Sequence, residues 1–150
     1  MKIYIFILIA LISVIAGCQI DKTGIPVRTN NATLNGTWYL KSEIIATTFD
    51  GYPEIPDNIT SFTTKDFYKF NPDFTVNISS SYTSGTITNY YSFNTTPTGQ
   101  TIIIGDTSTP AGISYTVTKL TKDSLVMNNI INQTSYGLTI NTNTTLKFTH

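Results

Sequence analysis

The sequence predicts an all-β fold, and three features of its composition and spacing support this class. Thr, Ile, Tyr, Phe and Val, which favour strands, are common, whereas only 12% of the residues are charged. Strong helix formers are scarce, glutamate occurring only at Glu43 and Glu54, and no long stretch spaces its apolar residues as a helix does. Short strand-like segments alternate with turn residues, a spacing typical of a sandwich or an up-and-down barrel.

Residues 1–17 have the features of a secretory signal peptide. Lys2 supplies a positive charge, and residues 3–16 are almost wholly apolar before the small residues Ala16 and Gly17. A membrane-spanning helix needs about 20 apolar residues, but Gln19 follows too early for that. We therefore expect this segment to be removed.

The residues Ile15-Ala16-Gly17-Cys18 resemble the lipoprotein signal of bacteria, in which small residues precede a lipid-modified cysteine. The resemblance implies that Cys18 becomes the mature N-terminus and carries acyl chains such as palmitate, because two or more chains anchor a protein stably. It also implies a place in the bacterial cell envelope, at the outer membrane or the cell surface. The alternative is an ordinary signal peptide followed by a chance cysteine.

The remaining chain divides into a tether and one domain. Residues 18–33 are polar and contain Gly24 and Pro26, as expected of a tether, and residues 34–150 form the domain. The chain has equal numbers of basic and acidic residues, which argues against nucleic acid as a partner. Because Cys18 is the only cysteine, lipidation would leave none for a disulfide.

The first strand carries the only tryptophan of the chain, and Trp38, Leu40 and Ile44 are expected to share one of its faces. A long irregular connection should follow, and its aromatic residues between Phe49 and Phe62 suggest either a lid or an ordinary surface loop. The later strands alternate apolar and polar residues between short turns. The expected strands are residues 36–48, 65–71, 74–82, 86–94, 100–104, 114–120, 124–130, 134–140 and 144–149.

Two turns between these strands have a physical basis in the sequence. Residues 71–73 (Asn-Pro-Asp) favour a turn because proline presets φ and the flanking side chains bond nearby amides. Phe74 follows where Gly is usual, although phenylalanine suits a positive φ poorly. Residues 141–143 (Asn-Thr-Asn) are expected to form the last turn.

Three segments together resemble the bacterial lipocalin-like lipoproteins over residues 34–148. These are the opening motif Gly36-Thr37-Trp38, residues 68–75 (YKFNPDFT) and residues 115–127 (YTVTKLTKDSLVM). The resemblance implies an antiparallel up-and-down β-barrel of about eight strands with a central cavity, which side chains fill or one small ligand occupies. It also implies that a cation from the last strand lies over Trp38, and Lys147 is the candidate.

Eight apolar and tyrosine residues are expected to point into such a barrel. They either fill it or line a pocket for a small hydrophobic molecule, with tyrosine hydroxyls as the polar groups. The candidate ligand-binding residues are Tyr68, Phe70, Val76, Ile78, Tyr91, Tyr115, Val117 and Met127.

No constellation for catalysis is visible. His150 is the only histidine, so neither a Ser-His-Asp set nor a Cys/His metal cluster is expected, and no cofactor is implied. Asp50, Glu54 and Asp57 lie close together but miss the spacing of a calcium loop, which favours a solvated loop. Two non-enzymatic functions remain. One is a carrier or sensor of a small apolar molecule, and the other is a module that contacts a protein partner, such as an inhibitor or an envelope-complex subunit.

Overall fold

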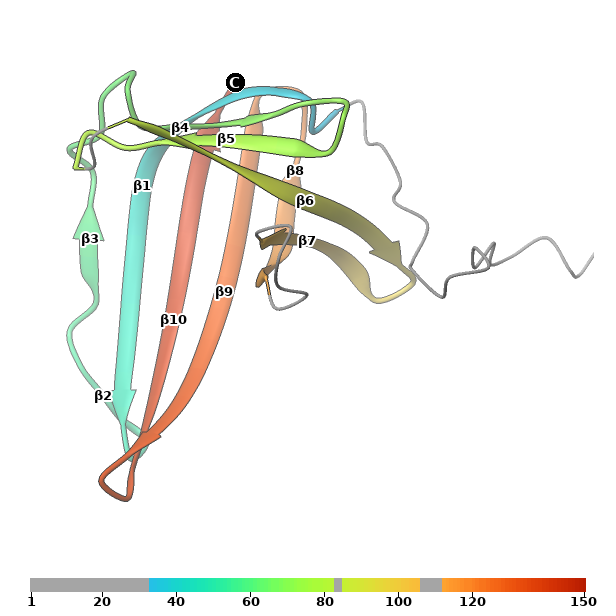
Figure 1. Cartoon of the computed structure of the whole chain (residues 1–150). Coiled ribbons are helices and arrows are strands. Elements are labelled where there is room, and N and C mark those ends of the chain that lie inside the picture. Colours follow the sequence, from blue (N-terminus) through green and yellow to red (C-terminus); the bar gives the residue numbers. More distant parts are fainter. Residues whose placement is uncertain (1–32, 83–84, 106–111) are drawn as a thin grey trace, which may run out of the picture.

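The computed structural model describes residues 33–82, 85–105 and 112–150. The expected signal peptide, the expected lipidation site Cys18 and the expected tether up to residue 32 lie outside the described residues. All regular structure in the described part is β-strand, and the antiparallel strands close into an eight-stranded barrel, so the predicted fold class is confirmed (Figure 1). No helix in these residues is long and apolar enough to cross a membrane.

The barrel strands follow one another in chain order around the sheet. Strands β1, β4, β5, β6, β7, β8, β9 and β10 each pair with the next, and β10 pairs with β1 to close the ring. The bounds are β1 (Gly36–Phe49), β2 (Tyr52–Pro53), β3 (Asp57–Ile59), β4 (Phe67–Phe70), β5 (Thr75–Ser79), β6 (Thr86–Thr96), β7 (Gly99–Gly105), β8 (Ile113–Leu120), β9 (Ser124–Ser135) and β10 (Leu138–Thr149).

The segment between β1 and β4 is only partly the irregular connection that the sequence suggested, because it contains the short strands β2 and β3. Asp50 and Gly51 both have positive φ, at 50° and 84°, which makes a tight two-residue turn. β2 then pairs with the end of β1, and β3 pairs with Glu43, Ile44 and Ile45 of β1. One edge of β1 is thus covered in turn by β4, β3 and β2, so that β2 and β3 extend the sheet.

The last hairpin also differs from the expectation. β9 and β10 run unbroken on either side of Tyr136 and Gly137, whose φ values are 52° and 82°. The residues expected to turn, 141–143, lie within β10 opposite residues 130–132 of β9. In Figure 1, β1, β9 and β10 lie side by side and continue well past the ends of β4 and β5.

A β-bulge decides which residues of β1 point into the barrel. The register against β10 shifts between Leu40 and Ser42, so that Glu43 pairs with the buried Leu146. Because paired residues point to the same face, Glu43 points inward and Ile44 outward. The expectation that Ile44 shares a face with Trp38 was therefore wrong.

One end of the barrel is filled by side chains. Trp38, buried completely, donates from Nε1 to the carbonyl of Leu34 at 2.7 Å. The ring of His150 meets it edge to face, with centroids 5.0 Å apart. Lys147 does not lie over Trp38, because the neighbours Leu146 and Phe148 point inward and Lys147 is exposed on the outer face.

The filled end contains most of the large apolar side chains. Phe70 and Tyr91 pack edge to face at 5.0 Å, and the Tyr91 hydroxyl donates to the carbonyl of Asn71 at 3.0 Å. The buried core comprises Leu34, Trp38, Phe70, Val76, Tyr91, Phe93, Ile102, Ile104, Tyr115, Val117, Leu125, Met127, Leu146 and Phe148.

Candidate functional site

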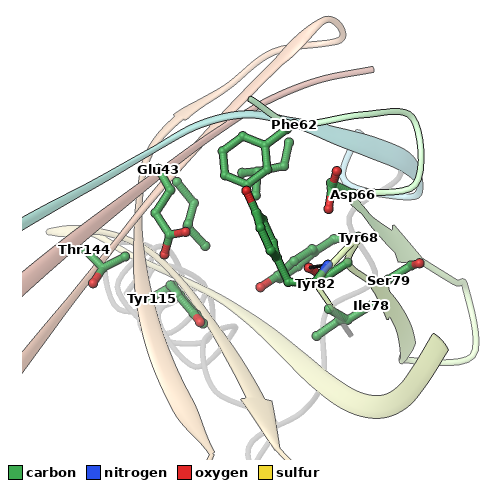
Figure 2. A pocket seen from close by; sticks show the side chains of 12 residues that line it. Glu43, Phe62, Asp66, Tyr68, Ile78, Ser79, Tyr82, Tyr115 and Thr144 are labelled. Atoms are coloured by element: carbon green, nitrogen blue, oxygen red, sulfur yellow. Dashed lines mark hydrogen bonds between the residues drawn. The ribbon is translucent and has the colours of Figure 1, made fainter. Parts of the chain in front are cut away.

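A cavity of about 200 Å³ lies inside the barrel beyond the filled end. Strands β1, β4, β5, β8 and β10 contribute to its wall, together with the segments on either side of β4 and β5 (Figure 2). The lining residues are Leu40, Glu43, Phe62, Asp66, Tyr68, Ile78, Ser79, Ser80, Tyr82, Tyr115, Thr144 and Leu146.

Tyr68 forms the boundary between this cavity and the packed core. Its ring lies 5.0 Å from the ring of Phe148, which is buried and does not line the cavity. Ile78, paired with Tyr68 across β4 and β5, adds an apolar wall beside it. The cavity therefore has an apolar floor.

A pair of tyrosine hydroxyls and one carboxylate provide polar groups within the cavity. The hydroxyls of Tyr68 and Tyr115 lie near enough for each to influence the pKa of the other. Burial raises the pKa of both hydroxyls, and the negative charge of Glu43 raises both further. Figure 2 shows Glu43 and Tyr115 on one side of the cavity and Asp66 on the other, with Tyr82 between them. The two hydroxyls remain protonated at neutral pH and can donate or accept hydrogen bonds.

The second carboxylate, Asp66, has a structural role. Its oxygens accept from the amide and hydroxyl of Thr63, at 2.7 and 2.9 Å, and from the amide and hydroxyl of Ser81, at 2.6 and 2.8 Å. Burial by itself would raise the pKa of Asp66, but these bonds outweigh it and lower the pKa to about 2. Asp66 thereby fixes the two segments that carry Phe62 and Tyr82 into the cavity.

Comparison of the chain with models of protein families, with curated proteins and with solved structures found no match.

The residues that line the cavity determine which chemistry it can support. Among the described residues, no three His, Cys, Asp or Glu side chains gather where they could hold a metal ion. Two carboxylates, three tyrosines and three serine or threonine hydroxyls face a small space with an apolar floor. Such a lining suits reversible binding of a small molecule that has both apolar and polar parts.

The eight residues expected to bind a ligand divide into two groups. Tyr68, Ile78 and Tyr115 line the cavity. The other five belong to the packed core and are not among the lining residues, so for them the alternative of simple barrel filling holds: Phe70, Val76, Tyr91, Val117 and Met127. Strand alternation predicted that these side chains point inward, but it could not predict how far along the barrel axis each of them lies.

Several lining residues were not expected from the sequence. Glu43 turns inward only because of the bulge in β1, which no local pattern marks. Asp66 and Tyr82 lie outside the strands, so strand alternation could not place them. Phe62 is the only residue of the suspected lid that reaches the cavity. Thr144 could have been found by extending the inward alternation of Leu146 and Phe148 by one step.

Proposed function

We propose that this protein is a membrane-anchored lipoprotein of the bacterial envelope whose lipocalin-like barrel binds a small, largely apolar molecule. The observation that carries the proposal is the cavity of about 200 Å³. Tyr68 and Ile78 form its apolar floor, and carboxylates and hydroxyls provide polar groups elsewhere in its lining. Pockets for drug-sized ligands usually have about 300–1,000 Å³, so the ligand is expected to be small. No catalytic step and no cofactor are part of the proposal.

Native mass spectrometry of the full chain purified from its own cells tests the binding. The expected result is a retained small molecule, and a clean mass of the protein alone would contradict the proposal. Thr144→Phe should fill the cavity and abolish retention, because Thr144 lines it. Thr145→Phe is the matched control, since Thr145 is the next residue of β10 and points to the outer face.

The membrane anchor is tested separately by labelling cells with palmitate. The full chain should incorporate the label, and Cys18→Ala should not, because the thioether to the lipid needs the thiol. An unlabelled chain would contradict the anchor while leaving the binding proposal intact.

A second candidate function, docking of a protein partner, has one observation in its favour. Apolar side chains are exposed at the far end of β1, β9 and β10. There the amide of Asp50 donates to the carbonyl of Thr139, and the amide of Thr139 donates to the carboxylate of Asp50. Exposed groupings of this kind often mark interaction sites. The residues are Phe49, Tyr52, Ile55, Ile131, Tyr136 and Leu138.

Photocrosslinking in cells distinguishes this second function from the first. A photoreactive residue in place of Tyr136, which is fully exposed, should give a discrete adduct with an envelope protein. The same residue in place of Thr98, exposed in another turn, is the control. Equal crosslinking at both positions, or none at either, would exclude the docking function.

A further inference from the structure

The charges that line the cavity are all of one sign. Glu43 and Asp66 are both acidic, and no Lys, Arg or His is among the lining residues, although the whole chain is neutral. The oxygens of Asp66 already accept hydrogen bonds from Thr63 and Ser81. Glu43, by contrast, has no hydrogen bond or ion pair with any residue in the described part of the chain. The cavity thus holds one carboxylate whose charge is not neutralised by any group in the described part of the chain.

An apolar ligand without charge would leave this carboxylate in an unfavourable state. As the ligand fills the cavity it displaces water from Glu43, and a desolvated charge without a partner is costly. A ligand that brings a positive charge avoids this cost, because the carboxylate then gains a partner. The unpaired Glu43 therefore selects for a cation.

The aromatic side chains around the cavity favour the same kind of ligand. Phe62, Tyr68, Tyr82 and Tyr115 all line the cavity together with Glu43, and Figure 2 shows their side chains on several sides of it. The faces of aromatic rings carry partial negative charge and attract ammonium groups, above all quaternary ones. Several rings and a carboxylate in one small cavity form a recognisable setting for an organic cation.

We propose that the cavity binds a small organic cation, a protonated amine or quaternary ammonium with an apolar body, whose charged group lies between Glu43 and the surrounding aromatic rings. The proposal rests on the proposed binding function and names its ligand class. The apolar part of the ligand packs on the floor formed by Tyr68 and Ile78.

Titration calorimetry with matched probes tests the proposal on the full chain in a neutral sugar detergent. The probes are benzyltrimethylammonium and neopentylbenzene, which has the same shape with a neutral carbon in place of nitrogen. The cation should bind about tenfold or more tightly than the neutral probe. Glu43→Gln should remove most of this difference, whereas Glu54→Gln, an exposed carboxylate away from the cavity, should not change it.

The outcomes separate this inference from the function on which it rests. If both probes bind the parent with equal affinity and neither binds Thr144→Phe, the preference for a cation is overturned and the small-molecule site is kept. Binding of neither probe would overturn both. Thermal melting checks that Glu43→Gln is as stable as the parent. If this variant still prefers the cation, the role of Glu43 is overturned.

Discussion

The imidazole of His150 lies against the backbone of Gly36, in the space that a side chain at position 36 would fill. A Cβ added to Gly36 would collide with Nε2 of the imidazole, and the φ of 132° at this residue is itself unfavourable for any side chain. The same imidazole contacts Trp38 edge to face. The Gly-x-Trp motif thus has a physical explanation at the filled end of the barrel: the glycine leaves room for the ring that covers the tryptophan.

Gly36→Ala is expected to destabilise the protein for both reasons. The backbone conformation alone should cost about 1–3 kcal/mol, and displacement of His150 from Trp38 adds to this. Urea unfolding measures the change.

Repeating Gly36→Ala in a chain that already carries His150→Ala separates the effect of the imidazole from that of the backbone conformation. In His150→Ala the collision is absent, so Gly36→Ala should cost less there than in the parent chain. An identical cost in both backgrounds would show that the imidazole does not occupy the space beside Gly36.

Phe74 provides a second test of backbone strain, because it has a φ of 64° in the turn after Pro72. Its ring lies 6.0 Å from that of Tyr91, and this packing compensates for the strain. Phe74→Ala loses the packing and keeps the strain, whereas Phe74→Gly loses both. The glycine variant should therefore be more stable than the alanine variant by about 1 kcal/mol, as measured by urea unfolding.

Phe70 offers the matched control for this order. It is buried at the end of β4, paired with β1 on one side and β5 on the other, and does not have a positive φ. There, glycine should be less stable than alanine by roughly 0.5–1 kcal/mol, the usual order in a strand. The same order at both positions would argue that the turn at Phe74 is not left-handed.

The all-β class was predictable because it depends on composition and alternation, which are properties of many residues at once. The positions of single residues were not predictable in the same way, because each depends on one local feature, such as a bulge or a turn. Lys147 was expected over Trp38, but the inward parity set by Leu146 and Phe148 turns it outward. Residues 141–143 had the composition of a turn, yet the chain turns at Tyr136 and Gly137, where two positive φ values fit the twist of the long hairpin.

Of the candidate site, the sequence predicted the residues that follow strand alternation and missed those set by irregular features. Tyr68, Ile78 and Tyr115 were expected to point inward, and they line the cavity. Glu43 was missed because the bulge after Leu40 reverses the parity of β1. A bulge adds one residue without a distinctive sequence, so alternation fails beyond it.

Asp66 is expected to make the stability of the protein fall in acid. Its pKa is about 2 in the folded protein and 3.8 ordinarily, so the unfolded chain takes up the proton first as the pH falls. The stabilisation is complete above pH 3.8 and is lost progressively toward pH 2. Asp66→Asn should be less stable than the parent at pH 7 by about 2 kcal/mol, and this difference should shrink between pH 4 and pH 2.

Asp57→Asn is the control for this pH dependence. Asp57 is exposed in β3, and its replacement should change the free energy of unfolding by less than about 0.5 kcal/mol at any pH. Urea unfolding at several pH values measures both variants. A difference between parent and Asp66→Asn that is the same at pH 7 and pH 2 would contradict the hydrogen-bonded carboxylate.

Glu43 is expected to influence the ionisation of the two cavity tyrosines. Burial is the largest cause of the raised pKa of Tyr68 and of Tyr115, and the charge of Glu43 adds to it in both. Glu43→Gln should therefore lower both pKa values while leaving them above the ordinary value of 10.0. Because the unfolded chain loses these protons first, stability should decline as the pH rises above 10, and less steeply in the variant.

NMR titration of tyrosines labelled at Cζ measures the pKa values, with Tyr115→Phe to assign the signals. If Glu43→Gln and Glu54→Gln titrate like the parent chain, the carboxylate of Glu43 does not face the tyrosines, and its proposed contact with a cation fails too.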